Sequence, residues 1–406
     1  MPTQDVDRDT TWRLTTASQE WILAGDATIA VDESVGIDDD AFSNSIVVLG
    51  TIRAAGVSSS GVSISARTSS LTVGSTGVID CSAGGFGVLL DGTGINVVNE
   101  GLISGRYRGI SGIATGKIEN TGTIIAETGI FYESAVNVEN SGVIAGFTGI
   151  ESGSGGAFVS NLAGGNISGT GYGIALVRDS GPATIVNEGV IRGGNAAIYC
   201  EGTLNLTNSG RIFGDLLLSV NGDRIDTRKG EIHGAIYGGD GDDLYLISKS
   251  DTDIRDNGSS FHDKVMSSAS YTLVGGLDHL DLIGRRNVNG TGNAGVNDME
   301  GNAGNNRLSG MDGVDFLNGG RGKDVMIGGN GEDVFLFNKR DGVDIVLDFV
   351  DGVDRLASES INTQRDFNRL DIRQVEDDVV IDFGQGDRLI LRDTMKADIG
   401  YSDFEV

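Results

Sequence analysis

Residues 292–336 read GNAGVNDME, GNAGNNRLS, GMDGVDFLN, GGRGKDVMI and GGNGEDVFL, which are five consecutive segments of nine residues. Every segment has glycine at its first and fourth positions and an apolar side chain at its eighth, in order Met299, Leu308, Leu317, Met326 and Phe335. Six residues of such a segment form a turn, for which glycine supplies backbone angles that other residues avoid, and three form a strand with one buried side chain. This stretch therefore predicts a solenoid that grows by stacking short strands.

The overall composition agrees with a regular repeat structure. Glycine occurs 65 times but proline only twice, so the glycines are typical of turns and not of a linker. The net charge of -28 repels phosphate backbones and anionic membranes, so we expect no nucleic-acid binding, whereas it suits divalent cations. No apolar run is long enough for membrane insertion, and the polar start MPTQDVDRDTTWRL predicts export without a cleaved leader.

A second repeat, with a period of about 20 residues, occupies the first half of the chain. Its units include VVNEGLISG at 97–105, KIENTGTIIA at 117–126 and NVENSGVIAG at 137–146. Short alternating apolar runs separated by tight turns predict a right-handed parallel β-helix with stacked isoleucines inside. Each unit also carries one asparagine, and we expect these to form a ladder in which each amide bonds the turn of the next coil: Asn99, Asn120, Asn140, Asn161, Asn187 and Asn208.

The domain boundaries follow from where the repeats fade. The asparagine is absent from the earliest units, so the coils are expected to start near residue 45 and to run to residue 235. Residues 1–44, which contain Trp12, Trp21 and the acidic stretch 38–40, are then expected to cap the first coil and cover its open edge.

The nine-residue pattern resembles the calcium-binding repeats of the RTX (repeats-in-toxin) family, whose form is G-G-x-G-x-D-x-U-x with U apolar. The resemblance covers about residues 218–406. It implies an all-β chain in which the β-helix continues into a parallel β-roll, where two nonapeptides complete one coil and loops that stack on successive coils share ions. Carboxylates and backbone carbonyls of these loops would supply the oxygen shell that a hard cation such as Ca²⁺ prefers.

The sixth position of each nonapeptide is the expected calcium ligand. We expect two to three well-formed ions, with Asp315 stacked on Asp333 and Asn306 on Asp324, and weaker sites where Asn297 and Asn306 replace aspartate. The predicted ligand set in this run also includes one further acidic residue and the glycines of the turns: Asp312, Gly310, Gly319 and Gly328.

A further nonapeptide, GGDGDDLYL, begins at Gly238 and offers Asp240 and Asp243 as ligands. Asp223 precedes Asp243 by the length of one coil of the β-helix, so the sequence predicts an ion shared by these two carboxylates.

The roll is expected to span residues 236–337. Residues 338–406, with the chain end SDFEV, resemble the β-rich C-terminal cap and uncleaved type I secretion signal of RTX proteins. Asp344, Asp348 and Asp354 are expected to be solvated cap carboxylates, and further calcium ligands are the alternative.

The sequence thus predicts a non-enzymatic calcium-binding protein with a structural or adhesive role at a surface or in a matrix. Its expected location is extracellular, secreted or associated with the cell surface, and it is expected to fold when calcium binds outside the cell. The expected partners are Ca²⁺, the type I secretion apparatus and either further copies of the chain or an extracellular polysaccharide.

The alternative is a polysaccharide-binding or polysaccharide-modifying protein, because secreted alginate epimerases also join a β-helix to RTX modules. Those enzymes rely on clustered His, Tyr and Asp, whereas His233, His262 and His279 lie at or beyond the end of the β-helix and in no such motif. The His-Glu-x-x-His motif of secreted metalloproteases does not occur. The candidates for stacking on sugars are five aromatic residues: Tyr107, Phe131, Tyr132, Phe147 and Tyr172.

Overall fold

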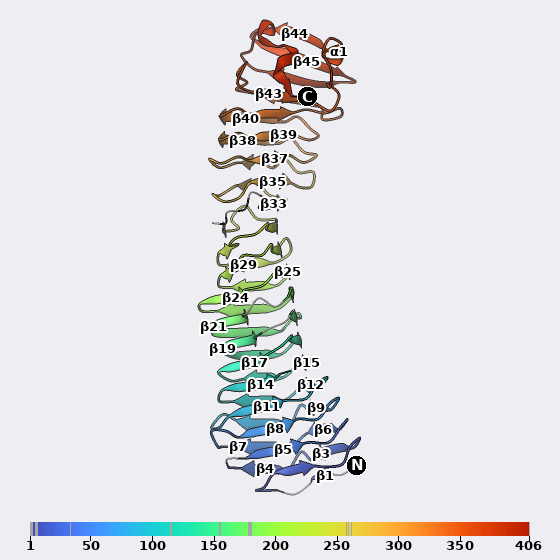
Figure 1. Cartoon of the computed structure of the whole chain (residues 1–406), viewed down its shortest axis with the longest axis vertical. Helices are drawn as coiled ribbons and strands as arrows, with labels where there is room; N and C mark the ends of the chain where they lie inside the picture. Colours follow the sequence, from blue (N-terminus) through green and yellow to red (C-terminus); the bar gives the residue numbers. More distant parts are fainter. Residues whose placement is uncertain are drawn as a thin grey trace. The chain divides into compact units, whose positions relative to one another are not determined.

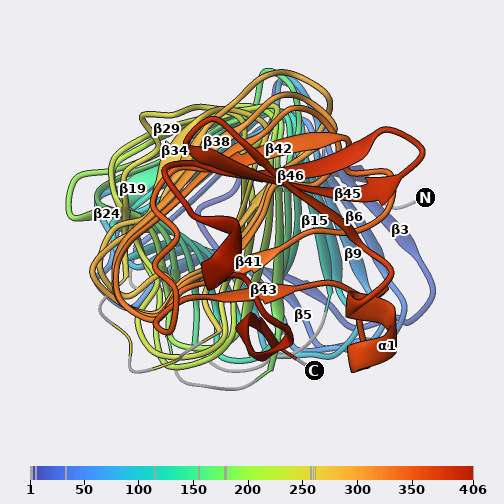
Figure 2. The same cartoon turned by 90° about the horizontal axis from the view of Figure 1, so that it is seen from above.

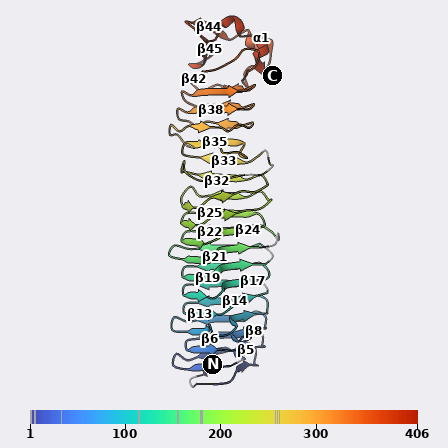
Figure 3. The same ribbon diagram turned by 90° about the vertical axis from the view of Figure 1, so that its left-hand side faces the viewer.

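A computed structural model describes the chain except for residues 1, 2, 5, 6, 33, 114, 115, 154, 155, 178–180, 257, 259, 261 and 406. The fold divides into two compact units, Met1–Tyr237 and Gly238–Val406. Within each unit, short strands stack coil upon coil and pair in parallel (Figures 1 and 3). The prediction of an all-β chain that forms a parallel β-solenoid is confirmed. Among the described residues, no helix has the length and apolar character needed to cross a membrane.

Each coil of the first unit contributes strands to three columns. The first column comprises β1 (Thr3–Gln4), β3 (Glu20–Leu23), β6 (Ser45–Val48), β9 (Ser70–Val73), β12 (Asn96–Asn99), β15 (Lys117–Asn120), β18 (Asn137–Asn140), β20 (Phe158–Asn161), β22 (Ala183–Asn187), β25 (Leu204–Asn208) and β28 (Arg224–Asp226). The second comprises β4 (Thr28–Val31), β7 (Thr51–Ala54), β10 (Val78–Cys81), β13 (Leu102–Gly105), β16 (Thr123–Ile125), β23 (Val190–Gly193), β26 (Arg211–Phe213) and β29 (Glu231–His233). The third comprises β2 (Trp12–Leu14), β5 (Val35–Asp39), β8 (Ser60–Ile64), β11 (Phe86–Leu90), β14 (Arg108–Gly112), β17 (Thr128–Tyr132), β24 (Ala196–Cys200), β27 (Leu216–Leu217) and β30 (Ile236–Tyr237). The long strands β19 (Val143–Ser152) and β21 (Asn166–Leu176) bend through the second and third columns.

The apolar core of the first unit is built from columns of identical or similar side chains. In the second strand column, Ile103, Ile124 and Ile144 are Cα partners on successive coils, and all three are fully buried. Each isoleucine is covered by the isoleucine of the neighbouring coil, so burial of one coil depends on the next. The predicted stack of isoleucines is confirmed.

Each of the six asparagines is the last residue of a strand of the first column. Together they form a continuous buried ladder along that column. The side-chain amide of Asn99 donates to the side-chain carbonyl of Asn120 over 2.7 Å, and Asn120 donates to Asn140 over the same distance. The bonds continue through Asn161 and Asn187 to Asn208, each at 2.8 Å. The predicted ladder is confirmed, although its main contact joins one amide to the next, in addition to bonds with backbone carbonyls of the turns.

The coils begin earlier than the sequence predicted. Strands β1 to β5 already pair in parallel with the strands one coil on, as in Trp12 with Ile37 and Trp21 with Ile46. Strands β1 to β5 therefore extend the solenoid, and the expected start near residue 45 is wrong. The early coils carry no asparagine ladder; instead Asn44 donates to the buried carboxylate of Asp39 over 2.7 Å, and Ser69 donates to it over 2.9 Å.

The second unit has coils of two strands. One column comprises β31 (Leu244–Ile247), β33 (Lys264–Ser267), β35 (His279–Leu282), β37 (Asp298–Glu300), β39 (Phe316–Asn318), β41 (Val334–Leu336), β43 (Arg355–Ala357) and β47 (Phe404–Glu405). The other comprises β34 (Tyr271–Thr272), β36 (Gly290–Thr291), β38 (Arg307–Asp312), β40 (Val325–Asn330), β42 (Val343–Val346) and β46 (Asp387–Leu391). The short strand β32 (Ile254–Arg255) lies between β31 and β33 in the sequence. From β37 to β39 and from β39 to β41, paired residues are offset by two nonapeptides, so two nonapeptides complete one coil as predicted.

The end of the second unit departs from the parallel pattern. Strand β45 (Asp378–Gly384) pairs antiparallel with both β46 and β44 (Asp371–Val375). Figure 2 shows β45, β46 and the helix α1 (Gln364–Phe367) in red. Two short 3-10 helices, η1 (Lys396–Asp398) and η2 (Tyr401–Asp403), precede β47. Val406, the last residue of the predicted secretion signal, lies outside the described residues.

Replacing Asn140 by alanine tests the ladder. The change removes the acceptor of Asn120 and the donor of Asn161, so polar groups stay buried without their partner. We expect the free energy of unfolding to fall by about 2 kcal/mol. Urea unfolding followed by circular dichroism in excess calcium measures the change. Asn137→Ala, at the exposed start of the same strand, is the control, and an equal loss for both variants would contradict the ladder's role.

Candidate metal centre

In the second unit, a polar residue stands immediately before each strand of the column from β31 to β43. Because these strands pair in register, the residues before them occupy equivalent places on successive coils. We call this set the acidic column: Asp243, Asp263, Asp278, Asn297, Asp315, Asp333 and Asp354. All but Asp278 are buried.

In this column, one oxygen of a carboxylate accepts a hydrogen bond from a backbone N–H of the preceding coil. The backbone N–H of Asn297 donates to Asp315 Oδ1 over 2.8 Å, and the N–H of Asp315 donates to Asp333 Oδ1 over 3.0 Å. The N–H of Asp333 donates in the same way to Asp354 Oδ1 over 3.1 Å. Backbone bonding thus fixes the orientation of the carboxylates without using all their oxygens.

A shorter column follows the same rule on the other side of the coils. The N–H of Asn306 donates to Asp324 Oδ1 over 2.6 Å, and the N–H of Asp324 donates to Asp344 Oδ1 over 2.9 Å. Asp324 and Asp344 are both fully buried. Asp344 is therefore a column residue and not the solvated cap carboxylate that the sequence predicted.

The second oxygen of several of these carboxylates is buried without a hydrogen-bond partner. In the described part of residues 291–354 this applies to Asp315 Oδ2, Asp324 Oδ2 and Asp344 Oδ2. A buried carboxylate oxygen without a partner costs several kcal/mol unless a cation or a proton compensates it. These oxygens are hard ligands of the kind that Ca²⁺ takes at 2.3–2.6 Å. The residues present therefore fit calcium.

Glycine at the first position of the nonapeptide makes room for the carboxylate. A Cβ on Gly310 would overlap Asp315 Oδ2 and lie 2.7 Å from Asp315 Cγ. A Cβ on Gly319 would lie 2.7 Å from Asp324 Cβ, and one on Gly328 would overlap Asp333 Oδ2. The predicted glycines therefore lie against the carboxylates.

The asparagines at the sixth position are already satisfied. Asn297 Oδ1 accepts the N–H of Asn293 over 2.7 Å, while its amide donates to Asn293 Oδ1 over 3.2 Å. Asn306 accepts from the N–H of Asn302 over 2.8 Å and donates to the carbonyl of Val288 over 2.6 Å. A neutral side-chain amide whose oxygen and nitrogen are both hydrogen-bonded is a weaker cation ligand than a carboxylate. This agrees with the weaker sites expected at these asparagines.

Three predicted ligands lie apart from these oxygens. Asp312 is exposed and accepts from the amide of Asn330, one coil on, over 2.7 Å. Asp240 lies at a bend and is exposed. Asp223 belongs to the first unit, where its Oδ1 accepts the N–H of Leu204 over 2.5 Å, so the ion expected between Asp223 and Asp243 stays a prediction.

Two further candidates of the C-terminal segment differ in availability. Asp348 receives the N–H groups of Gly328 and Gly329 over 3.0 and 2.9 Å, so both of its oxygens are occupied. Asp354 receives the N–H of Val350 on its second oxygen over 2.8 Å, in addition to the N–H of Asp333. These two carboxylates organise backbone, and Asp344 alone of the three has an oxygen without a hydrogen bond.

The sequence analysis missed Asp263 and Asp278. Asp263 begins DKVM and Asp278 begins DHLD, which match the D-x-U-x half of the nonapeptide. Gly275 and Gly276 form a turn before Asp278, whereas only Gly258 stands shortly before Asp263. The available signal was the spacing from Asp243 to Asp263, which equals the spacing from Asp223 to Asp243. Both residues have a buried Oδ2 that lacks a hydrogen-bond partner.

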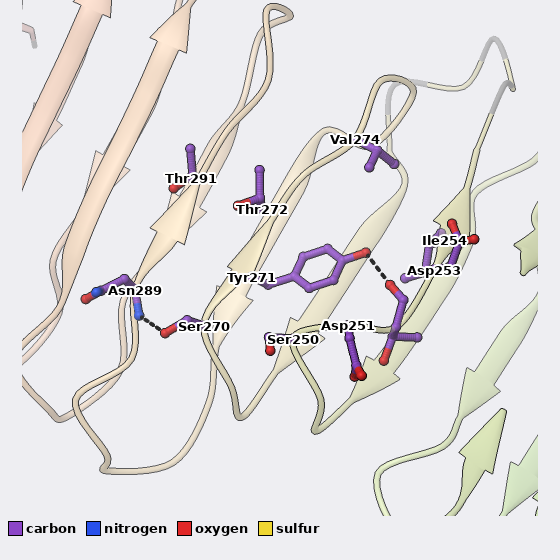
Figure 4. A pocket seen from close by; sticks show the side chains of 11 residues that line it. Ser250, Asp251, Asp253, Ile254, Ser270, Tyr271, Thr272, Val274, Asn289 and Thr291 are labelled. Carbon is purple, nitrogen blue, oxygen red and sulfur yellow. Dashed lines mark hydrogen bonds between the residues drawn. The ribbon is translucent and has the colours of Figure 1, made fainter. Parts of the chain in front are cut away.

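A surface pocket in the second unit offers no catalytic pair among its lining residues (Figure 4). The hydroxyl of Tyr271 donates to the carbonyl of Thr252 over 3.3 Å, and Ser270 accepts the N–H of Asn289 over 2.9 Å. The Asp253 carboxylate is held by Arg255 over 2.8 Å. These polar groups hold the walls of the pocket together, and none pairs a nucleophile with a base.

Comparison with known proteins gives one family match. Residues 291–326 and 300–335 match the model of the RTX calcium-binding nonapeptide repeat (4 copies). No curated protein matches the sequence. Among solved structures, extracellular lipase LipA from Serratia marcescens aligns at 15% identity and a TM-score of 0.20. The alignment covers 62% of this chain and 44% of that chain, so this chain spans less than half the length of the lipase.

Replacing Gly310 by alanine tests whether the close approach of the first glycine matters. The new Cβ displaces the Asp315 carboxylate, so we expect calcium affinity at this place to weaken about 10- to 100-fold. Calorimetric titration of the full chain measures the change. Gly275→Ala is the matched control, because nothing lies within 4 Å of a Cβ there. Equal affinities in both variants would contradict the assignment.

A pH series tests the burial of the carboxylates. Desolvation raises the pKa of Asp315 from 3.8 to about 7, and burial also raises the pKa of Asp324, Asp333 and Asp344. A carboxyl with a raised folded-state pKa stabilises the calcium-free fold below its unfolded pKa, and this stabilisation is lost as the pH rises through the folded pKa. In EDTA we therefore expect the second unit to lose stability from about pH 4 to about pH 8, where Asp344 ionises last.

Calcium must displace these protons, so its affinity should rise over the same pH range. Thermal unfolding in EDTA and calorimetric titration with CaCl₂ at each pH measure both trends. Asp315→Asn should flatten the trend, whereas Asp377→Asn, which changes an exposed carboxylate, should leave it intact. Stability in EDTA that increases with pH would contradict the prediction.

Proposed function

Because residues 291–335 are RTX calcium-binding nonapeptide repeats, we propose that the chain is a secreted, calcium-dependent structural or adhesive protein. The observation that carries the proposal is the set of buried carboxylate oxygens without hydrogen-bond partners at Asp315, Asp324 and Asp344. In calcium-poor cytosol their charges oppose folding of the second unit. In millimolar extracellular calcium, ion binding becomes folding free energy and closes the coils.

The proposed export route is type I secretion with an uncleaved C-terminal signal. An unfolded second unit before export and a folded unit after it would make translocation effectively one-way. The support is the order of elements along the chain, in which the acidic columns are followed by the antiparallel strands β44 to β46.

The first unit supplies the proposed contact surface. Its strand columns repeat from coil to coil, and on the first column Lys117 forms ion pairs with Glu119 and with Glu139 of the next coil over 2.7 and 3.0 Å. Exposed apolar side chains lie on the second column and the bend after it, including Ile125, Val143 and Phe147. A repetitive surface of this kind suits side-by-side association with further copies of the chain.

A neutral polysaccharide is the second candidate partner, because aromatic rings also follow the outer face of the third strand column. Phe147 is 51% exposed, Tyr107 pairs with Phe86 at 6.4 Å, and Tyr172 pairs with Tyr199 at 5.9 Å between ring centres. Tyr132, in contrast, is buried and cannot reach a sugar. The net charge of -28 disfavours acidic glycans. Retardation in a gel that contains a neutral glucan, lost in Phe147→Ala but not in Val143→Ala, would favour this candidate.

Calcium titration of the full chain tests the main proposal. Circular dichroism should show a gain of strand signal, and electron microscopy should show ordered assemblies only with calcium. The double variant Asp315→Asn and Asp333→Asn should need more calcium, whereas Asp377→Asn and Asp398→Asn, which change exposed carboxylates, should match the parent chain. A circular dichroism spectrum that calcium does not change would contradict the calcium-dependent fold. Monodisperse monomers both with and without calcium would contradict self-association.

A further inference from the structure

Three buried carboxylates come together in the second unit outside the matched repeats. Asp243, Asp256 and Asp263 each place a carboxylate oxygen within 4.8 Å of the others. Their exposed fractions are 1%, 2% and 0%, so the cluster is not a solvated acidic patch. Of the three, Asp256 belongs to no nonapeptide and to neither acidic column.

Backbone N–H groups donate to two carboxylates of the cluster, and one carboxylate oxygen is left without a hydrogen bond. Asp263 Oδ1 accepts the N–H of Asp243 over 2.8 Å, while Asp263 Oδ2 is buried without a hydrogen-bond partner. Asp256 Oδ1 accepts the N–H of Gly258 over 3.0 Å. These two donors are neutral backbone groups, so they bring no positive charge to the carboxylates.

The hydroxyl of Tyr245 lies between two of the carboxylates. It is 2.9 Å from Asp243 Oδ2 and also 2.9 Å from Asp256 Oδ2. One phenol proton cannot form a strong bond to both oxygens at once, so two carboxylates are held together with at most one proton between them. A cation bound to these oxygens would remove their mutual repulsion.

Because Gly238 has no side chain, the space beside the Tyr245 hydroxyl and the two carboxylates stays open. A Cβ at this position would overlap the Tyr245 hydroxyl and would lie 2.5 Å from Asp243 Oδ2 and 2.6 Å from Asp256 Oδ2. The close approach of a glycine to carboxylate oxygens repeats what Gly310 does at Asp315. It brings a backbone segment close to the carboxylates of the cluster.

We propose that Asp243, Asp256 and Asp263 bind a divalent cation of the calcium type, at a site where Asp256, which belongs to no nonapeptide, joins two carboxylates of the acidic column. Two Ca–O bonds of 2.3–2.6 Å span about 4.6–5.2 Å, which accommodates ligand oxygens within 4.8 Å of one another. The inference deepens the proposed calcium-dependent function and rests on it for the choice of ion.

Tyrosine-sensitised terbium luminescence tests the site in the full chain. Residues 291–335 contain no tyrosine or tryptophan, so terbium at the matched repeats is poorly sensitised, whereas terbium beside Tyr245 is excited directly. We expect Asp256→Asn and Asp263→Asn each to lose most of this emission and to bind one fewer calcium ion per chain in equilibrium dialysis. Tyr245→Phe preserves the packing and should lose the emission while keeping the ion.

Two controls separate this inference from the proposed function. Asp251→Asn changes an exposed carboxylate in the same segment and should behave as the parent chain. Asp315→Asn should lose calcium at the repeats but keep the Tyr245 emission. Parental emission and calcium count in both Asp256→Asn and Asp263→Asn would overturn the new site and leave the repeat sites intact. A parent chain that binds no calcium at all would overturn both.

Discussion

In the second unit, a backbone N–H of one coil is bonded to the carboxylate of the next, and the other carboxylate oxygen is left buried without a hydrogen-bond partner at several steps. The coils cannot stack without bringing these charges to within about 5 Å of one another, the spacing of adjacent strands. At an effective dielectric constant of about 20, two such charges repel by about 3 kcal/mol. This repulsion is the reason for our proposal that stacking of the coils is coupled to cation binding.

Both units bury a column of polar side chains, but the side chains differ in how their hydrogen bonds are satisfied. An asparagine amide carries both a donor and an acceptor, so the ladder from Asn99 to Asn208 completes itself from coil to coil without charge. A carboxylate has only acceptors when ionised, so the columns of Asp315 and Asp324 need a partner from outside the chain. Under the proposed function, the change from asparagine to aspartate makes the stacking of the second unit depend on calcium.

Repetition explains how much of this was predictable from the sequence. The stacked isoleucines, the asparagine ladder and the coil of two nonapeptides recur often enough to be read as patterns. The start of the solenoid was misplaced because the early coils use Asp39, Asn44 and Ser69 in place of the repeating asparagine. Asp256 could not be predicted, because the loop that brings it to Asp243 has no repeat and only the folded chain makes them neighbours.

Hydrogen exchange of backbone amides, with and without calcium, tests the coupling of stacking to cation binding most directly. The N–H groups of Asn297, Asn306 and Asp315 donate to column carboxylates, whereas Thr121 and Ser141 donate to backbone carbonyls beside the asparagine ladder. We predict that calcium slows exchange strongly in the first group and leaves the second unchanged. Equal protection of the first group in EDTA and in calcium would contradict the account.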